Sequence, residues 1–330
     1  MPESRDLEKR IFSIKNSSSF NKLALDIFYF QYSNNQVYRQ FVDLLGVNPL
    51  TVKHYSKIPF LPIEFFKDHK VVTTDFDAAT IFTSSGTTGQ TNSRHFIKSL
   101  ESYEQSFVTH FMQQFGPPDN YILLALLPSY LERDGSSLIF MVEKLIRLTN
   151  DPISGFYLHD YKKLYEVLKS LKNTHKKVML LGVTYALMDL AEAFPLDFSG
   201  LILMETGGMK GKRKELLRAE IHKVLKKAFG IKNVYSEYGM TELLSQAYSH
   251  GDGIFQSPAW MKVLIRDMND PLSLLENGKT GGMNIIDLAN LYSCSFIATK
   301  DLGRNISEST FEMLGRYDNS DIRGCNLMIS

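Results

Sequence analysis

The segment between residues 82 and 94 has the composition of a phosphate-binding loop. Within it, residues 84–89 hold four hydroxyl side chains and two glycines, in the order Ser84, Ser85, Gly86, Thr87, Thr88 and Gly89. Glycine permits positive φ angles and close approach of the backbone, so such a loop can present hydroxyls and N–H groups to an anion. The same composition is typical of flexible polar linkers. Strand-like residues directly before it (78–82) and after it (94–98) favour a loop that the fold holds in place, and therefore phosphate binding.

A second polar turn, Tyr238-Gly239-Met240-Thr241-Glu242, follows the strand-like run that begins at Val234. Mg²⁺ needs only one or two carboxylates when phosphate and water supply its other oxygens, so Glu242 is a candidate metal ligand. Taken alone, a threonine followed by a glutamate is more typical of the capped start of a helix. Together with a phosphate-binding loop, the turn predicts contacts to a nucleotide and its metal.

Two charged segments near the end of the chain could hold a nucleoside. Residues 298–304 contain Asp301, and residues 314–319 contain Arg316. A carboxylate can accept from both ribose hydroxyls, and an arginine beside it can add phosphate or ribose contacts. Each segment alone is typical of a charged turn.

Several other classes of site do not fit. Gly278-Lys279-Thr280 resembles the end of a Walker loop, but position 273 is Ser273 where that motif needs glycine. No Gly-x-Ser-x-Gly sequence occurs, which argues against the commonest serine hydrolases. The eight histidines lack the paired spacing of zinc ligands.

The two cysteines, Cys294 and Cys325, have different surroundings. A lone cysteine is more often an inert core residue than a nucleophile. Cys294 lies among aromatic residues and is expected to be structural. Cys325 lies five residues from the end of the chain beside Arg323, where we expect mobility and a cation that favours the thiolate.

Composition indicates a globular cytoplasmic protein. Among its 330 residues, 44% are apolar and the formal net charge is +1, so no basic excess points to nucleic acid. Two cysteines make no disulfide framework, which suits a reducing compartment. The highly charged start has no signal peptide after it, and the longest apolar run, 121–127, is too short to span a membrane.

The pattern of elements predicts an α/β fold. Residues 1–66 are helical in pattern, with Pro59 and Pro62 in a connector. From residue 120 onward, apolar strands alternate with amphipathic helices, which predicts a mostly parallel sheet flanked by helices. The strands are expected at 121–127, 178–183, 201–204 and 234–238, and the helices at 136–148, 161–171 and 212–229. Ligands bind at the carboxyl ends of such strands, where the polar loops 83–94, 205–211 and 239–242 lie. Short strands at 261–265, 283–286 and 296–298 predict a smaller β-rich C-terminal portion.

In this order, the four polar segments resemble the adenylate-forming enzymes, which include acyl-CoA ligases, firefly luciferase and peptide-synthetase adenylation domains. The similarity extends from about residue 80 to the end. Three further segments, 58–62, 128–138 and 321–325, resemble the LuxE family, the acyl-protein synthetases of bacterial fatty acid reductase, over essentially the whole chain.

The resemblance implies a nucleotide site. Ser84 to Gly89 would wrap the β- and γ-phosphates of ATP. The adenine would be bordered by Gly207, Gly208 and the segment that ends at Tyr238 and Gly239. Thr241 would contact the α-phosphate and Glu242 would hold Mg²⁺. Asp301 and Arg316 would bind the ribose.

The chain departs from the wider family at two places. Thr91-Asn92 replaces the loop's usual Pro-Lys, and Arg94 is our candidate for the missing charge. The chain stops just after the hinge segment, so the small C-terminal ligase domain is expected to be absent. We therefore expect an adenylation domain over residues 1–314 and a hinge-like tail over 315–330.

The implied reaction has two steps. A fatty or other carboxylic acid would form an acyl-adenylate with ATP, and Cys325 would take the acyl group as a thioester for an acyl-reductase or acyl-carrier partner. Two alternatives stay open at this point. One is an acyl- or aryl-CoA ligase that uses free CoA or a carrier-protein thiol. The other is a non-catalytic nucleotide-binding subunit that assembles with a reductase.

Overall fold

The computed structural model describes residues 4–84, 91–128, 135–207 and 216–317. The chain forms two compact units. The first comprises residues 1–79, 86–98 and 256–330, and the second comprises residues 80–85 and 99–255. The boundary that we expect between an adenylation domain and a tail at residue 315 stays a prediction.

The second unit is built on a parallel sheet with the strand order β5-β4-β6-β7-β8, to which β9 adds antiparallel. All six residues of β4 are buried, because a strand covered on both faces needs a continuous apolar sequence. The strands are β2 (Thr80–Thr83), β4 (Tyr121–Leu126), β5 (Gly155–Phe156), β6 (Lys177–Val183), β7 (Ile202–Thr206), β8 (Tyr235–Tyr238), β9 (Ala247–Ser249) and β10 (Ile254–Gln256), the last of which ends at the unit boundary.

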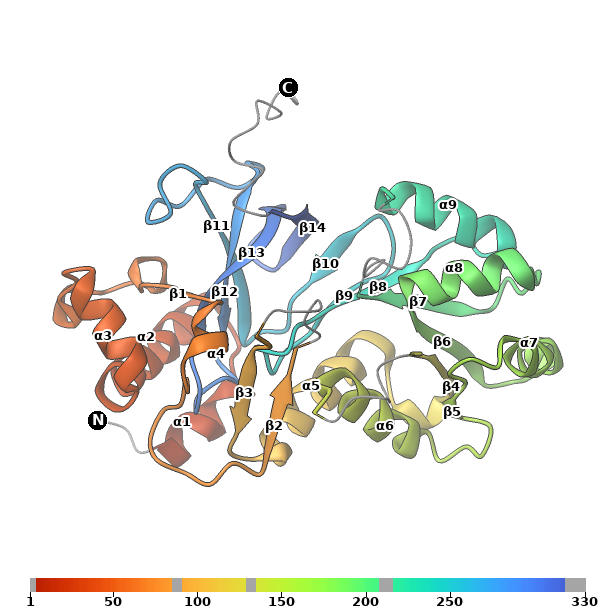
Figure 1. Cartoon of the computed structure of the whole chain (residues 1–330), viewed down its shortest axis with the longest axis horizontal. Helices are drawn as coiled ribbons and strands as arrows, with labels where there is room; N and C mark the ends of the chain where they lie inside the picture. Colours follow the sequence, from red (N-terminus) through yellow and green to blue (C-terminus); the bar gives the residue numbers. More distant parts are fainter. Residues whose placement is uncertain (1–3, 85–90, 129–134, 208–215, 318–330) are drawn as a thin grey trace. The chain divides into compact units, whose positions relative to one another are not determined.

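Helices cover both faces of this sheet. Figure 1 shows α8 and α9 on one face and α5 and α6 on the other. The helices are α5 (Leu100–Phe115), α6 (Ser137–Thr149), α7 (Tyr161–Ser170), α8 (Thr184–Ala193) and α9 (Arg218–Phe229), with the 3-10 turns η3 (Pro118–Asn120) and η4 (Leu171–Asn173). The predicted alternation of strands and helices is thus confirmed.

One predicted helix begins in a different place. The pattern predicts a helix from residue 212, but α9 begins at Arg218, and residues 208–215 lie outside the described part of the chain. The Glu220 carboxylate accepts a hydrogen bond of 3.0 Å from the Leu217 backbone N–H. This bond satisfies an N–H at the helix start and fixes where the helix begins.

The first unit combines the N-terminal helices with an antiparallel sheet in the order β11-β12-β13-β14. Strand β1 pairs in parallel with β13. The elements are α1 (Ser4–Ile11), α2 (Ser17–Asn34), α3 (Gln36–Leu44), η1 (Pro49–Thr51), η2 (Tyr55–Lys57), β1 (Leu61–Pro62), α4 (Phe65–Asp68), β3 (Arg94–Ile97), β11 (Met261–Arg266), β12 (Gly281–Asp287), β13 (Phe296–Asn305) and β14 (Thr310–Arg316).

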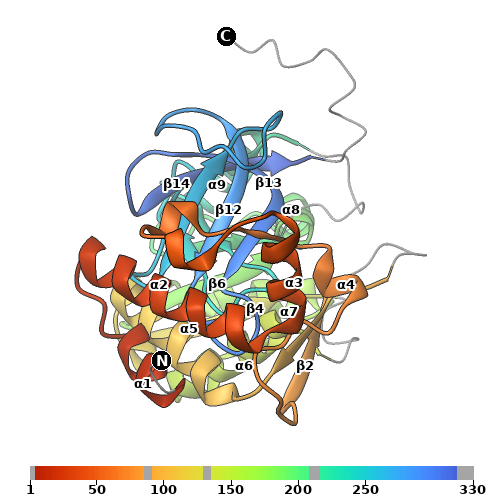
Figure 2. The same cartoon turned by 90° about the vertical axis from the view of Figure 1, so that its left-hand side faces the viewer.

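The N-terminal helices pack on the sheet of this unit through aromatic rings and buried amides. Figure 2 shows α2 and α3 in front of the β12 and β13 strands. The ring of Phe296 on β13 lies 6.2 Å from Phe28 and 6.1 Å from Tyr38, measured between centroids. The buried Gln31 amide donates 2.9 Å to the Asn290 carbonyl and 3.0 Å to the Leu291 carbonyl. The first third of the chain therefore shares its core with the last third.

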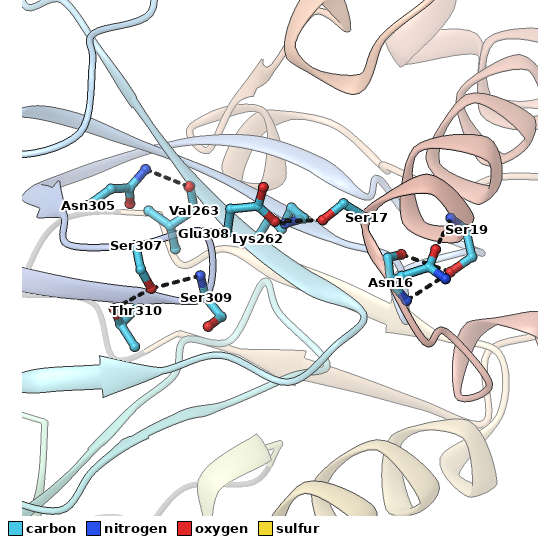
Figure 3. Close-up of polar contacts among 10 residues, drawn as sticks. All are labelled: Asn16, Ser17, Ser19, Lys262, Val263, Asn305, Ser307, Glu308, Ser309 and Thr310. Atoms are coloured by element: carbon cyan, nitrogen blue, oxygen red, sulfur yellow. Dashed lines mark hydrogen bonds and ion pairs between the residues drawn. The ribbon is translucent and has the colours of Figure 1, made fainter.

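A polar contact ties the start of α2 to the turn between β13 and β14 (Figure 3). The Ser17 hydroxyl donates to the Glu308 carboxylate at 2.6 Å, and the Lys262 ammonium lies 3.3 Å from the same oxygen. Asn16 and Ser19 cap the helix reciprocally, because each side chain accepts from the other's backbone N–H. The α2 start is therefore capped locally and held to the sheet.

Candidate active site

The carboxyl ends of β7 and β8 bring two of the predicted nucleotide segments together. The strands are parallel neighbours, with Thr206 in register with Glu237. Gly207 follows β7 with a φ of 72°, a left-handed conformation that glycine adopts without strain. Tyr238 ends β8, is buried, and leads into Gly239.

The Thr241–Glu242 step lies in a turn. Leu243 donates its N–H to the Met240 carbonyl at 3.1 Å, and the next element is strand β9. The helix-cap interpretation of this step is therefore wrong. Glu242 is buried, with 5% of its surface exposed, and Thr241 is half-buried. A buried carboxylate beside a hydroxyl is a set of hard oxygen donors.

The phosphate loop lies mostly outside the described residues. Ser84 follows β2 and is half-buried. Near it, the Thr83 N–H donates to the Gly135 carbonyl at 2.8 Å, which fixes the end of β2. Residues 85–90 lie outside the described part, as do Gly208 and Cys325, so those predictions stay predictions.

Sequence reasoning missed a buried polar network beneath the β7 and β8 ends. Its centre is Glu205, whose carboxylate accepts from Thr184 Oγ1 at 2.7 Å and Ser236 Oγ at 2.8 Å. Arg218 Nε lies 3.4 Å away, and His222 Nε2 lies 3.6 Å away, which is too long for a good hydrogen bond. Burial raises the pKa of Glu205, but these partners outweigh burial and leave the pKa below its usual value. Glu205 is therefore an ionised residue at neutral pH.

A second buried carboxylate, Glu237, lies on the neighbouring strand. It accepts a short hydrogen bond from the Thr206 hydroxyl. Burial, together with the charge of Glu205, raises the pKa of Glu237 to about 7, although the Thr206 bond opposes this rise. The sequence does carry a signal for this network: Glu205 and Glu237 each lie near the end of a strand, two residues before a glycine.

In the first unit, Asp301 and Arg316 form an ion pair on neighbouring strands. They are register partners of β13 and β14, and Arg316 Nε donates to Asp301 Oδ1 at 3.1 Å. The interpretation of residues 298–304 as a charged turn is wrong, because β13 runs through them, and residues 314–316 of the second segment belong to β14. Along β13, buried residues alternate with partly exposed ones, and Asp301 falls on the buried side.

The same strands are held by Arg266, which sequence reasoning did not single out. Its guanidinium is buried and donates to the Met283 carbonyl at 2.7 Å, to the Thr299 carbonyl, and to the Tyr317 hydroxyl. Tyr317 also donates its N–H to the Lys300 carbonyl at 3.0 Å. Arg266 therefore fixes the strand residues on either side of the Asp301–Arg316 pair.

Two other predicted residues have defined surroundings. Arg94 begins β3, is exposed, and lies with its guanidinium 5.9 Å from the Phe96 ring centroid, at the outer limit of a cation–π contact. Cys294 is fully buried, and burial raises the pKa of its thiol to about 12. The structural interpretation of Cys294 is confirmed.

Comparison with solved structures defines the class of fold. An open conformation of 2-hydroxyisobutyryl-CoA ligase, in complex with 2-HIB-AMP and CoA, matches with a TM-score of 0.67 and 14% identity over 93% of this chain and 72% of that chain. ATP-bound MatB from Rhodopseudomonas palustris matches with a TM-score of 0.53 and 18% identity over 74% of this chain. The matched region is 50% of the MatB chain. The fold is that of the adenylate-forming enzymes.

Sequence comparison identifies the family within that class. The family model for acyl-protein synthetase, LuxE, matches residues 11–330, so the chain belongs to the LuxE family and is a ligase. It is 25% identical to the long-chain-fatty-acid–luciferin-component ligase of Vibrio harveyi, over 94% of this chain and 87% of that protein. The protein of the same name in Aliivibrio fischeri is 24% identical over the same shares of the two chains. None of the helices in the described part of the chain has both the length and the apolar character needed to cross a bilayer.

Proposed function

We propose that this enzyme uses ATP and Mg²⁺ to convert a long-chain fatty acid to an acyl-adenylate, and then carries the acyl group as a thioester on Cys325. The observation that carries the proposal is the arrangement at the β7 and β8 ends. There Gly207 and the Tyr238–Glu242 turn follow adjacent strands. Parallel sheets bind ligands at this edge.

The residues present fit a magnesium ion. The buried Glu242 carboxylate would hold it, with the phosphate oxygens of ATP completing the coordination. When bound, the ion neutralises phosphate charge. Thr241, in the same turn, would orient the α-phosphate with its hydroxyl, and Ser84 would be the first hydroxyl of the loop around the β- and γ-phosphates.

The first step replaces a poor leaving group with a good one. A carboxylate oxygen attacks the α-phosphorus, a new O–P bond forms, and the bond to the bridging oxygen breaks to release pyrophosphate. The chain contributes position and charge, which dominate catalysis of such transfers. Asp301 would accept hydrogen bonds from the ribose, and Arg316 would contact the ribose or the phosphate.

In the second step, the Cys325 thiolate attacks the acyl carbon. A C–S bond forms, the C–O bond to phosphate breaks, AMP leaves with the electron pair, and the thiol proton goes to solvent. Eight residues lead from Tyr317 to Cys325. An extended chain spans at most about 3.5 Å per residue, so the thiol can reach roughly 28 Å from Tyr317. Tyr317 itself is anchored beside Asp301 through Lys300 and Arg266.

The names of the relatives indicate a long-chain fatty acid as the substrate. On the same basis we propose an acyl-reductase as the recipient of the acyl group, with an acyl-carrier protein as the alternative. We also propose that the protein is cytoplasmic. We further propose that Arg94 supplies the positive charge near the phosphate loop.

The two cysteines make a matched test. After incubation with ATP, Mg²⁺ and a mixture of fatty acids, we expect the intact mass of the wild type and of Cys294→Ala to rise by one acyl group. Cys325→Ala should keep acid-dependent ATP–pyrophosphate exchange and lose the adduct. A hydroxylamine-labile adduct on Cys325→Ala would rule out this acceptor. CoA-dependent AMP release by Cys325→Ala would instead identify a CoA ligase.

Glu242 tests the first step. Glu242→Ala should lose both exchange and acylation, because the metal-binding carboxylate serves both. Undiminished exchange in Glu242→Ala would show that the magnesium assignment is wrong. Absence of exchange in the wild type, across a wide panel of carboxylic acids, would favour a non-catalytic nucleotide-binding subunit.

A further inference from the structure

Glu237 occupies a space between the two loops that we assign to the nucleotide. One carboxylate oxygen accepts from the hydroxyl of Thr206, the residue before Gly207. The other oxygen lies 2.5 Å from the point where a Cβ on residue 239 would lie. Its carboxyl group therefore binds the residue before Gly207 and lies close to Gly239, where a side chain would displace it.

Glu237 also lies beside a residue whose charge is fixed. Ser236 is in register with Glu205 and Glu237 is in register with Thr206, so Glu205 and Glu237 belong to adjacent register pairs of β7 and β8. Glu205 accepts from two hydroxyls, has Arg218 Nε 3.4 Å away, and stays ionised, whereas one side-chain hydroxyl donates to Glu237. An added negative charge on Glu237 would meet that of Glu205 in a region shielded from water.

We propose that Glu237 is a positioning residue that couples the two nucleotide loops, and that its neutral form holds them in the arrangement that binds ATP. This inference rests on the proposed function, because it assumes that ATP binds at these loops. In the neutral state, the carboxyl group accepts from Thr206 and packs close to Gly239 without repelling Glu205. In the ionised state, repulsion from Glu205 and from the phosphates of ATP disfavours the same arrangement.

Burial is the largest cause of the raised pKa of Glu237, and the charge of Glu205 on β7 adds to it. Arg218 and His222 on α9 lie against Glu205. Tyr248 on β9 is the register partner of Glu237, and the His110 ring of α5 stacks on Tyr248 at 5.2 Å between centroids. Burial and the charge of Glu237 raise the pKa of Tyr248 far above its usual value, so Tyr248 stays neutral. Glu237 itself has a pKa of about 7.

The test is direct binding of ATP to the full-length enzyme by calorimetry, at saturating Mg²⁺ and at pH 6 and pH 8.5. We expect the wild-type Kd to rise by roughly tenfold over this range, which corresponds to one pKa unit of coupling. Glu237→Gln keeps the shape and stays neutral, so its Kd should change by less than about twofold. Titration of ATP itself is common to both proteins and cancels in the comparison.

Two further variants separate positioning from general effects of charge. Glu166→Gln on α7 removes an exposed carboxylate from the same unit and should keep the wild-type pH dependence. Thr206→Val removes the hydrogen bond that stabilises the ionised form, so the midpoint of the change in Kd should move to higher pH. The Michaelis constant for the fatty acid should stay constant in both.

The outcomes distinguish this inference from the proposed function. An equal pH dependence of Kd in the wild type and in Glu237→Gln would overturn the coupling role, while pyrophosphate exchange by the same preparations would keep the proposed function intact. Absence of ATP binding at both pH values would overturn both. An unshifted midpoint in Thr206→Val would show that the Thr206 bond does not act through Glu237.

Discussion

Asp301 and Arg316 are paired across β13 and β14, but their exposure differs sharply. The Asp301 side chain is 4% exposed, whereas the Arg316 side chain is 74% exposed. The carboxylate is thus fixed in the sheet, and the guanidinium extends from it into solvent. Such a pair presents a rigid acceptor beside a donor that can move when a ligand arrives.

This asymmetry predicts different effects of the two residues. Asp301→Asn should raise the Michaelis constant for ATP by roughly ten- to a hundredfold, because a charge-assisted acceptor for the ribose is lost. Arg316→Ala should also weaken ATP binding, but it should change the free energy of unfolding by less than about 1 kcal/mol, because the 74% exposed side chain is screened by water. Steady-state kinetics and urea denaturation measure the two effects. A large loss of stability in Arg316→Ala would contradict the assignment.

The pairing of Asp301 with Arg316 was only partly predictable from the sequence. The motif order identified Asp301 and Arg316, but charged residues near glycine suggested turns. Their pairing depends on strand register across the β13–β14 hairpin, and residue types carry little information about such register. A buried aspartate on a strand looks like a surface residue until its partner is known.

In the second unit, the sheet was predictable, but its buried carboxylates were not. Apolar runs such as 121–126 and 178–183 are recognisable because strands covered on both faces need no polar alternation. Glu205 depends on Thr184, which lies 21 residues earlier in the chain. Only the folded sheet brings these groups together, so no local pattern could indicate them.

Arg266 should stabilise the first-unit sheet. Arg266→Met would leave the Met283 and Thr299 carbonyls and the Tyr317 hydroxyl without this donor, and we expect a loss of roughly 3 kcal/mol in the free energy of unfolding. Because Tyr317 begins the segment that leads to Cys325, acylation should fall more than pyrophosphate exchange. Urea denaturation and the two activity assays check this prediction.

Glycine substitutions supply a control for Arg266. A Cβ on residue 282 would lie 2.7 Å from Arg266 Cζ, so Gly282→Ala should displace the guanidinium and destabilise the protein. Gly155→Ala has open space around the new Cβ and should be close to neutral. Equal stability of the two variants would show that the position of Arg266 is not critical.

Glu237 should also make stability depend on pH. In the folded protein the pKa of Glu237 is about 7, above the ordinary 4.5. Between pH 4.5 and pH 7, Glu237 therefore keeps its proton in the folded protein and loses it in the unfolded chain. The contribution of Glu237 to the free energy of unfolding is therefore fully present below about pH 4.5, and it is lost as the pH rises through 7. Relative to the wild type, Glu237→Gln should gain stability as pH rises, by up to about 3 kcal/mol at pH 8. Denaturation by urea at pH 5 and pH 8 measures the difference. A constant difference at both pH values would contradict it.

The two cysteines should differ in their reaction with iodoacetamide. The Cys294 thiol is fully buried, donates to the Phe296 carbonyl at 3.4 Å, and has a pKa near 12, so its thiolate is scarce at pH 8. We expect native enzyme to be alkylated at Cys325 and not at Cys294, and both to react in guanidinium. Prior incubation with ATP, Mg²⁺ and fatty acid should protect Cys325, because a thioester has no free thiolate, and hydroxylamine should restore the reaction. Peptide mass spectrometry locates the label. Alkylation of Cys294 in native enzyme at the rate of Cys325 would contradict the buried placement, and unprotected Cys325 would contradict its role as acceptor.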